Sequence, residues 1–129
     1  IRFKNSIMYM KVESFKDLIV WQKGMTLVKN VYEITAGLPK DEIYALSSQL
    51  RRSSVSIPSN IAEGFRRGST KDYAHFLKIA LGSSAEVETQ LLLVKELHQA
   101  TSLQKIQEAL SLCEEIQKIL STIIKKLIE

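Results

Sequence analysis

Apolar side chains recur every three or four residues along most of the chain, the spacing that lines one face of an α-helix. The first segment with this spacing covers residues 17–36. Gly37-Leu38-Pro39 follows it, where glycine suits a helix C-terminal cap and proline prevents continuation. The apolar face expected for this helix consists of Leu18, Trp21, Met25, Val28 and Tyr32.

A second helix is expected to begin after Asp41, whose carboxylate can accept hydrogen bonds from first-turn amides, and to end between residues 64 and 68. Pro58 lies inside it, and proline removes one helical hydrogen bond and crowds the carbonyl group four residues earlier. We therefore expect a kink at Pro58, which either wraps the helix around its neighbours or shapes a binding site. The expected apolar positions are Ile43, Leu46, Leu50, Ile57 and Ile61.

Two capping boxes mark the starts of two further helices, Ser69-Thr70-Lys71-Asp72 and Thr101-Ser102-Leu103-Gln104. The third helix extends to about His98, with an apolar face of Tyr73, Leu77, Ala80, Ser84, Val87, Leu91 and Val94. The fourth has an apolar face of Leu103, Ile106, Leu110, Cys113, Ile116, Leu120, Ile123 and Leu127. Because the connections are short, consecutive helices run antiparallel. The pattern predicts an all-α, antiparallel up-and-down four-helix bundle.

This bundle is expected to form one domain over residues 14–129, with residues 1–13 as a flexible N-terminal segment or a remnant of cloning. The composition agrees, because 45% of the residues are apolar and only 5 Gly and 2 Pro interrupt them. No apolar run approaches the roughly 20 residues of a membrane span, and no signal peptide pattern is present, so we expect a cytoplasmic protein. Cys113, the only cysteine, is expected to be a buried apolar side chain.

Polar residues follow one face of the second predicted helix, and a matching polar row lies in the third. We expect a network in which Asn60 and Glu63 meet Ser83 and Glu86 and set the register of the two helices, although a solvated face is the simpler alternative. The proposed network contains Gln49, Ser56, Asn60, Glu63, Ser83 and Glu86. Two adjoining carboxylates would also raise one pKa, as a general acid requires, but no second feature supports catalysis.

Metal chemistry has little support in the sequence. Neither His75 nor His98 follows a glutamate by three residues, which is the Glu-x-x-His spacing of di-iron bundles. We therefore predict no catalytic residue, no metal site and no cofactor.

Basic residues gather in one part of the chain. The whole chain has a net charge of +4, and residues 51–71 reach the same value with five basic residues and one acidic residue, Glu63. The five are Arg51, Arg52, Arg66, Arg67 and Lys71. They form two patches about 24 Å apart along the helix. The second lies at the turn into the third helix, whose N-terminus also favours anions, and arginine can hold two phosphate oxygens at once. The alternative is a solvated basic surface.

Several strings make the chain resemble the "four helix bundle protein" family, first noticed in intervening sequences of bacterial large-subunit ribosomal RNA genes. They are FKDLIVWQK at 15–23, Leu38-Pro39, EIYALSSQLRR at 42–52, SIPSNIAEG at 56–64 and IALGSSAEVETQL at 79–91. The resemblance covers residues 14–127. Ala45 and Ala85 stand where the family often has Gly and Leu, which leaves the expected fold unchanged. The family has no established catalytic activity.

The resemblance implies an up-and-down bundle and a homopentameric ring. It also points to the accessory variability determinant proteins of diversity-generating retroelements, which form basic pentamers that bind nucleic acid and a reverse transcriptase. Five copies would carry about +20 and repeat each basic patch around one particle. We therefore expect a non-enzymatic, oligomeric protein that binds RNA or DNA through its five basic residues with little sequence specificity. The alternative is a ring-shaped scaffold for a protein partner, without direct nucleic-acid binding.

Overall fold

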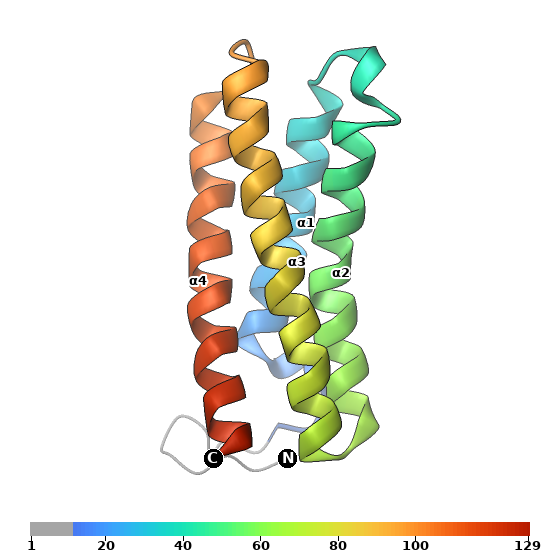
Figure 1. The fold of residues 1–129 in the computed structure, drawn as a ribbon, viewed down its shortest axis with the longest axis vertical. Helices are drawn as coiled ribbons and strands as arrows, with labels where there is room; N and C mark the ends of the chain where they lie inside the picture. The colour runs from blue at the N-terminus through green and yellow to red at the C-terminus, as the bar shows by residue number, and fades with distance from the viewer. Residues whose placement is uncertain (1–11) are drawn as a thin grey trace.

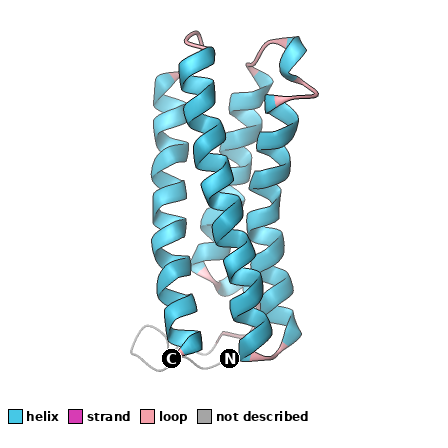
Figure 2. Ribbon diagram, viewed as in Figure 1, coloured by secondary structure: helices cyan, strands magenta, loops and turns pink. Residues whose placement is uncertain are grey.

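The described part of the chain, residues 12–129 of a computed structural model, consists of helices joined by short connections (Figure 2). Four are long α-helices and two are short 3-10 helices. In chain order they are η1 (Phe15–Asp17), α1 (Ile19–Ala36), η2 (Lys40–Glu42), α2 (Leu46–Arg67), α3 (Thr70–Leu97) and α4 (Leu103–Ile128). Most of the predicted N-terminal segment, residues 1–11, lies outside the described residues, and Val12 packs against the core. None of these helices is both long enough and apolar enough to cross a lipid bilayer.

The four long helices run alternately in opposite directions (Figure 1). The connections from α1 to α2 and from α3 to α4 lie at one end, and the turn from α2 to α3 lies at the other. Each helix packs against two neighbours, α1 and α3 both contacting α2 and α4. The predicted antiparallel four-helix bundle is therefore confirmed.

Helix starts differ from the expected positions for three of the four long helices, and α1 begins at Ile19 rather than at residue 17. Ser69 caps α3 as predicted, accepting a hydrogen bond from the Asp72 amide at 3.1 Å. The cap of α4 is Ser102, one residue later than expected. Asp41 does not cap α2, because the chain after Pro39 first makes the tight turn η2, and α2 begins only at Leu46. Ala45 is then the N-cap residue, and no side chain caps this helix.

The expected apolar face of α1 is wrong by about one residue. The buried positions are Val20, Gly24, Leu27, Val31, Ile34 and Thr35. Met25 and Tyr32 are instead exposed, at 38% and 44%. Helix α1 has apolar residues on two adjacent faces, and Gly24 determines which of these faces packs against the core. A Cβ atom on Gly24 would lie 3.5 Å from Ile57 and Pro58, so this position must face α2 to allow the two helices to approach.

The other three helices follow their predicted faces more closely. Every expected position of α3 is buried, from Tyr73 to Val94. In α2 the predicted Leu50, Ile57 and Ile61 are buried, whereas Ile43 lies outside the helix and is exposed. In α4 the central positions, including Cys113 and Leu120, are buried. Leu103, Leu110, Ile123 and Leu127 are only partly buried or exposed, and Ala109 and Ile124 join the core in their place.

Pro58 lies inside α2, which continues as one helix from Leu46 to Arg67. The proline ring is buried, and its Cβ and Cδ atoms face Gly24 of α1. Burial of the ring offsets part of the cost of the hydrogen bond that proline removes. The kink expected at Pro58 stays a prediction.

The closest approach between α2 and α3 lies at Gly64, near the turn that joins them. A Cβ atom at this position would lie 2.7 Å from the Cβ atom of Phe76 and 3.3 Å from the backbone oxygen of Tyr73. Neither of these atoms belongs to a freely movable chain end. Only glycine therefore fits this packing without displacement of α3.

We expect Gly64→Ala to lower the free energy of unfolding by about 1–3 kcal/mol, because the added methyl group overpacks the contact with Phe76. Gly82→Ala is the matched control, since Gly82 lies in α3 with nothing within 4 Å of an added Cβ atom. The control should raise the free energy of unfolding by about 0.5–1 kcal/mol. Urea unfolding of both variants at one protein concentration measures the difference, and equal effects would contradict the close approach at Gly64.

Two ionisable side chains of the core should make the protein less stable at alkaline pH. Burial raises the pKa of Tyr73 to about 12. Burial and the charge of Glu88 raise the pKa of Cys113 to about 12. The same groups ionise near 10.0 and 9.0 in the unfolded chain, which then binds fewer protons than the folded chain. We therefore expect the free energy of unfolding to fall as the pH rises from about 9 towards 12.

The variants Tyr73→Phe and Cys113→Ala test this pH dependence. Each removes one buried ionisable group, so the free energy of unfolding should fall less steeply with pH than in the wild type. Tyr73→Phe should cost little at neutral pH, because the buried Tyr73 hydroxyl has no hydrogen-bond partner among residues 12–129. Urea titrations at several pH values give the slopes, and slopes identical to that of the wild type would be evidence against the raised pKa values.

Candidate nucleic-acid interface

Arg51 lies in the second turn of α2 and is attached to α1. Its Nε atom donates a hydrogen bond to Thr35 Oγ1 at 2.8 Å, and its guanidinium carbon lies 4.7 Å from the centroid of the Tyr32 ring. Thr35 in turn donates to the carbonyl oxygen of Val31, so the acceptor is itself held in place. The half-buried guanidinium group is therefore held in a defined orientation, and Arg51 has a structural role as well as a charge.

A hollow of about 390 Å³ opens beside this contact at the start of α2. It is lined by Thr35, Ile43, Tyr44, Ser47, Ser48, Arg51 and Arg52. The walls thus come from the end of α1, the connection after η2 and the first two turns of α2. Arg52 is exposed and has no ion-pair partner in the described part of the chain.

The second basic group surrounds the turn from α2 to α3. Arg67 donates a hydrogen bond to Glu63 at 2.9 Å, one turn earlier, and its guanidinium carbon lies 5.0 Å from the centroid of the Phe76 ring. The guanidinium carbon of Arg66 lies 5.7 Å from the ring of Phe15 in η1. Lys71 is exposed in the first turn of α3.

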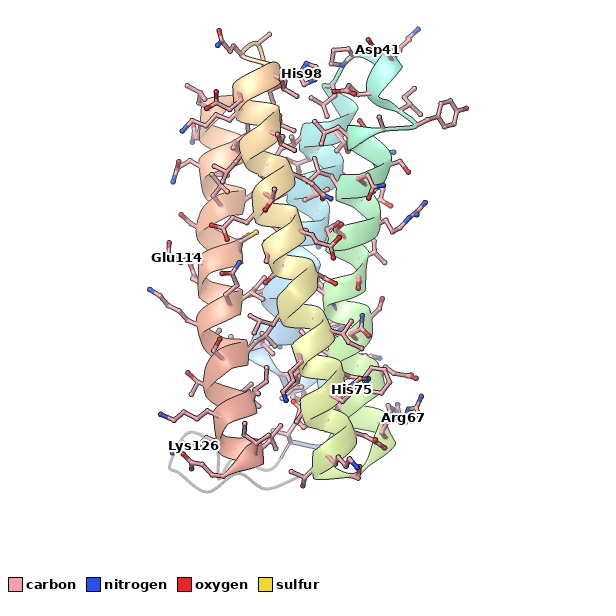
Figure 3. All side chains as sticks on the ribbon, in the orientation of Figure 1. Asp41, Arg67, His75, His98, Glu114 and Lys126 are labelled. Carbon is pink, nitrogen blue, oxygen red and sulfur yellow. The ribbon has the colours of Figure 1, made fainter. Side chains whose placement is uncertain are left out.

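The two basic groups therefore lie toward opposite ends of α2, as their spacing in the sequence predicts. Figure 3 shows Arg67 near the end of the bundle that holds the α2–α3 turn, far from Asp41 and His98 at the other end. The side chains also differ in direction, because Arg51 contacts α1 and Arg67 contacts α3. Together they give the outward surface of α2 a positive charge.

Three of the six residues expected in the polar network are hydrogen-bonded to one another. The hydroxyl oxygens of Ser56 and Ser83 are 2.8 Å apart across the α2–α3 contact. The Asn60 amide donates to the hydroxyl and carbonyl oxygens of Ser56, at 2.9 and 2.8 Å. Glu63 instead pairs with Arg67, while Gln49 and Glu86 are exposed. Small hydroxyl groups suit a close helix contact, whereas carboxylates lose too much hydration energy there.

A side-chain contact that sequence reasoning did not identify joins the two connections at one end of the bundle. His98 Nε2 lies 2.6 Å from Glu42 Oε2, and both side chains are mostly buried. The two residues are 56 positions apart, and neither belongs to a periodic pattern. Figure 3 shows His98 at the end of α3 beside the connection that contains Asp41, and His75 near the opposite end of the same helix.

The described residues contain no group of three His, Cys, Asp or Glu side chains that could hold a metal ion. His75 is exposed, and its ring lies 5.3 Å from that of Phe76. Cys113 is fully buried, and its raised pKa keeps the thiol protonated at neutral pH.

Comparison with known proteins agrees with the four-helix bundle and with the sequence resemblance. The family model of the 23S rRNA-intervening sequence protein matches residues 16–122. A solved structure from Bacteroides thetaiotaomicron, a protein of unknown function from the S23 ribosomal protein family, is 27% identical to the chain. It superposes with a TM-score of 0.75, covering 83% of this chain and 99% of its own. The search of curated proteins gave no match. Since the family model spans most of the bundle, the chain belongs to the 23S rRNA-intervening sequence protein family.

Proposed function

We propose that this chain is a non-enzymatic, oligomeric protein that binds nucleic acid, RNA in particular, by phosphate contacts with little sequence specificity. The contacting residues are Arg51, Arg52, Arg66, Arg67 and Lys71. The observation that carries the proposal is the concentration of basic side chains along α2 and its turn into α3, where the only acidic residue from 51 to 71, Glu63, pairs with Arg67. Such a surface attracts the phosphate backbone without reading bases.

The basic side chains are available to a ligand to different degrees. Arg52, Arg66 and Lys71 are exposed and form no ion pair among the described residues. Arg67 is half exposed in its pair with Glu63, and a surface pair of this kind contributes little, so a phosphate group can compete for the guanidinium. Arg51 is already held by Thr35 and Tyr32, which lowers the entropy it loses on binding.

Two further observations support the oligomeric RNA-binding form of the proposal. The family takes its name from intervening sequences of 23S ribosomal RNA, which associates it with an RNA context. Large apolar side chains are exposed on several helices, as expected where copies of a chain associate. They include Ile19, Leu92, Leu93, Leu97, Leu103 and Ile128. The pentamer expected from the family resemblance would repeat the basic surface five times and increase its avidity.

The same exposed apolar residues favour a second candidate function, a ring-shaped scaffold that binds a protein partner without contacting nucleic acid. In this case the basic surface serves only to keep the assembly soluble. The two functions differ in whether nucleic acid binds at low salt and whether binding depends on the surface of α2.

We expect the triple variant Arg52→Glu, Arg66→Glu, Lys71→Glu to lose most of its RNA binding. These positions are chosen because Arg51 and Arg67 donate hydrogen bonds to other side chains, whereas no side-chain hydrogen bond or ion pair to residues 12–129 is found for Arg52, Arg66 and Lys71. The slope of log affinity against log salt should become shallower by about 2 units per engaged subunit, as three phosphate contacts are lost. Fluorescence anisotropy with labelled RNA and duplex DNA at two salt concentrations measures both quantities.

A matched control carries the same charge change on the two other helices, α1 and α4. Lys29→Glu, Lys105→Glu, Lys125→Glu alters exposed residues of α1 and α4 and should retain much tighter binding than the α2 variant. Native mass spectrometry verifies that all three proteins form the same assembly. Absence of RNA binding by the wild type at low salt would refute the proposed function and favour the scaffold, and equal losses in both variants would exclude a localised basic interface.

A further inference from the structure

The hollow at the start of α2 contains hydroxyl groups and an aromatic ring in addition to basic side chains. Ser47 lines it and is only 4% exposed, yet its hydroxyl group has no hydrogen-bond partner among residues 12–129. The Ser47 oxygen is not among the fully buried atoms without a partner in the described residues, so it is open to the hollow and available to a ligand. Ser48, on the same wall, carries a second hydroxyl group.

The backbone beside these hydroxyl groups also favours an anion. Ala45 precedes α2 without any side-chain cap, so no side chain accepts hydrogen bonds from the first-turn amides of this helix. Arg51 and Arg52 complete the lining, one turn further along α2. Hydroxyl groups, free helix N-terminal amides and arginine together form the donor set that recognises phosphate.

An aromatic side chain stands at the rim of the same hollow. Tyr44 is 96% exposed, and Ile43 next to it is 51% exposed. The rigid turn of η2 and the late start of α2 place both residues outside the core. An exposed ring beside a phosphate-binding group is the combination with which proteins bind unpaired nucleotides, because a base whose face is free can stack on the ring.

We propose that this hollow binds one unpaired nucleotide of a single-stranded nucleic acid. Its phosphate group would bind to Ser47, Ser48 and Arg52, and its base would stack on Tyr44. This inference rests on the proposed nucleic-acid binding and deepens it, because it assigns a preference for single strands. In a duplex both faces of each base are covered by neighbouring pairs, so the duplex can reach the basic residues but cannot use Tyr44.

The test compares the full-length wild type with Tyr44→Ala and Tyr44→Phe. Labelled single-stranded RNA and the corresponding duplex are titrated at one salt concentration. Tyr44→Ala should weaken single-strand binding by about tenfold and leave duplex binding unchanged, since loss of a stacked base affects only the single strand. Tyr44→Phe keeps the ring and should bind both like the wild type. Because Tyr44 is almost fully exposed, neither change should affect folding.

Ser47→Ala tests the phosphate half of the site separately. It should weaken single-strand binding while the urea midpoint stays the same or rises, because the hydroxyl group has no partner to lose within the described structure. A purely structural role would instead lower the midpoint and leave affinity unchanged.

Each other outcome overturns the inference in a recognisable way. Unchanged single-strand binding by Tyr44→Ala, or equal weakening of single-strand and duplex binding, would contradict the nucleotide site. Neither result would contradict the proposed basic interface of α2. A smaller native mass of Tyr44→Ala identifies the hollow as a contact between copies of the chain. If the wild type binds neither nucleic acid at low salt, the proposed function fails together with the inference.

Discussion

The close packing of α2 between α1 and α3 is the constraint on which the rest of the structure depends. Gly24 admits the ring of Pro58 on one side, and Gly64 admits Phe76 on the other. Between these contacts, the paired hydroxyl groups of Ser56 and Ser83 need little space and satisfy each other. Small residues thus lie at several of the helix contacts of α2, beside the buried Leu50, Ile57 and Ile61, and its charged residues lie at the edges and outside.

This arrangement explains why the basic residues are both numerous and well ordered. An arginine at the edge of a tightly packed helix can lay its guanidinium group on the neighbouring helix, as Arg51 does on Tyr32 and Arg67 on Phe76. These contacts orient Arg51 and Arg67, although Arg67 also pairs with Glu63, and Arg52 is exposed without an ion-pair partner among the described residues. In an oligomer the basic surface of α2 would be repeated with the symmetry of the particle.

The connection between α1 and α2 forms a hollow at one end of the basic surface. Because η2 uses three residues in a tight turn, α2 starts late, Tyr44 is left outside the core, and the hollow forms beside Ser47. The 2.6 Å contact between the Glu42 and His98 side chains attaches the same connection to the end of α3. The turn therefore has a fixed position relative to the bundle, which a binding site requires.

The sequence by itself determined the four helices, the buried face of α3 and the basic residues of α2. These depend on local spacing, and in α3 the apolar spacing from Tyr73 to Val94 matches the buried face. Tertiary structure decided which of two apolar faces of α1 turns inward, because that choice depends on the fit of Gly24 against Pro58. It also decided the hydroxyl network and the hollow, because Ser56 meets Ser83, and Thr35 meets Arg51, only when separate helices pack together.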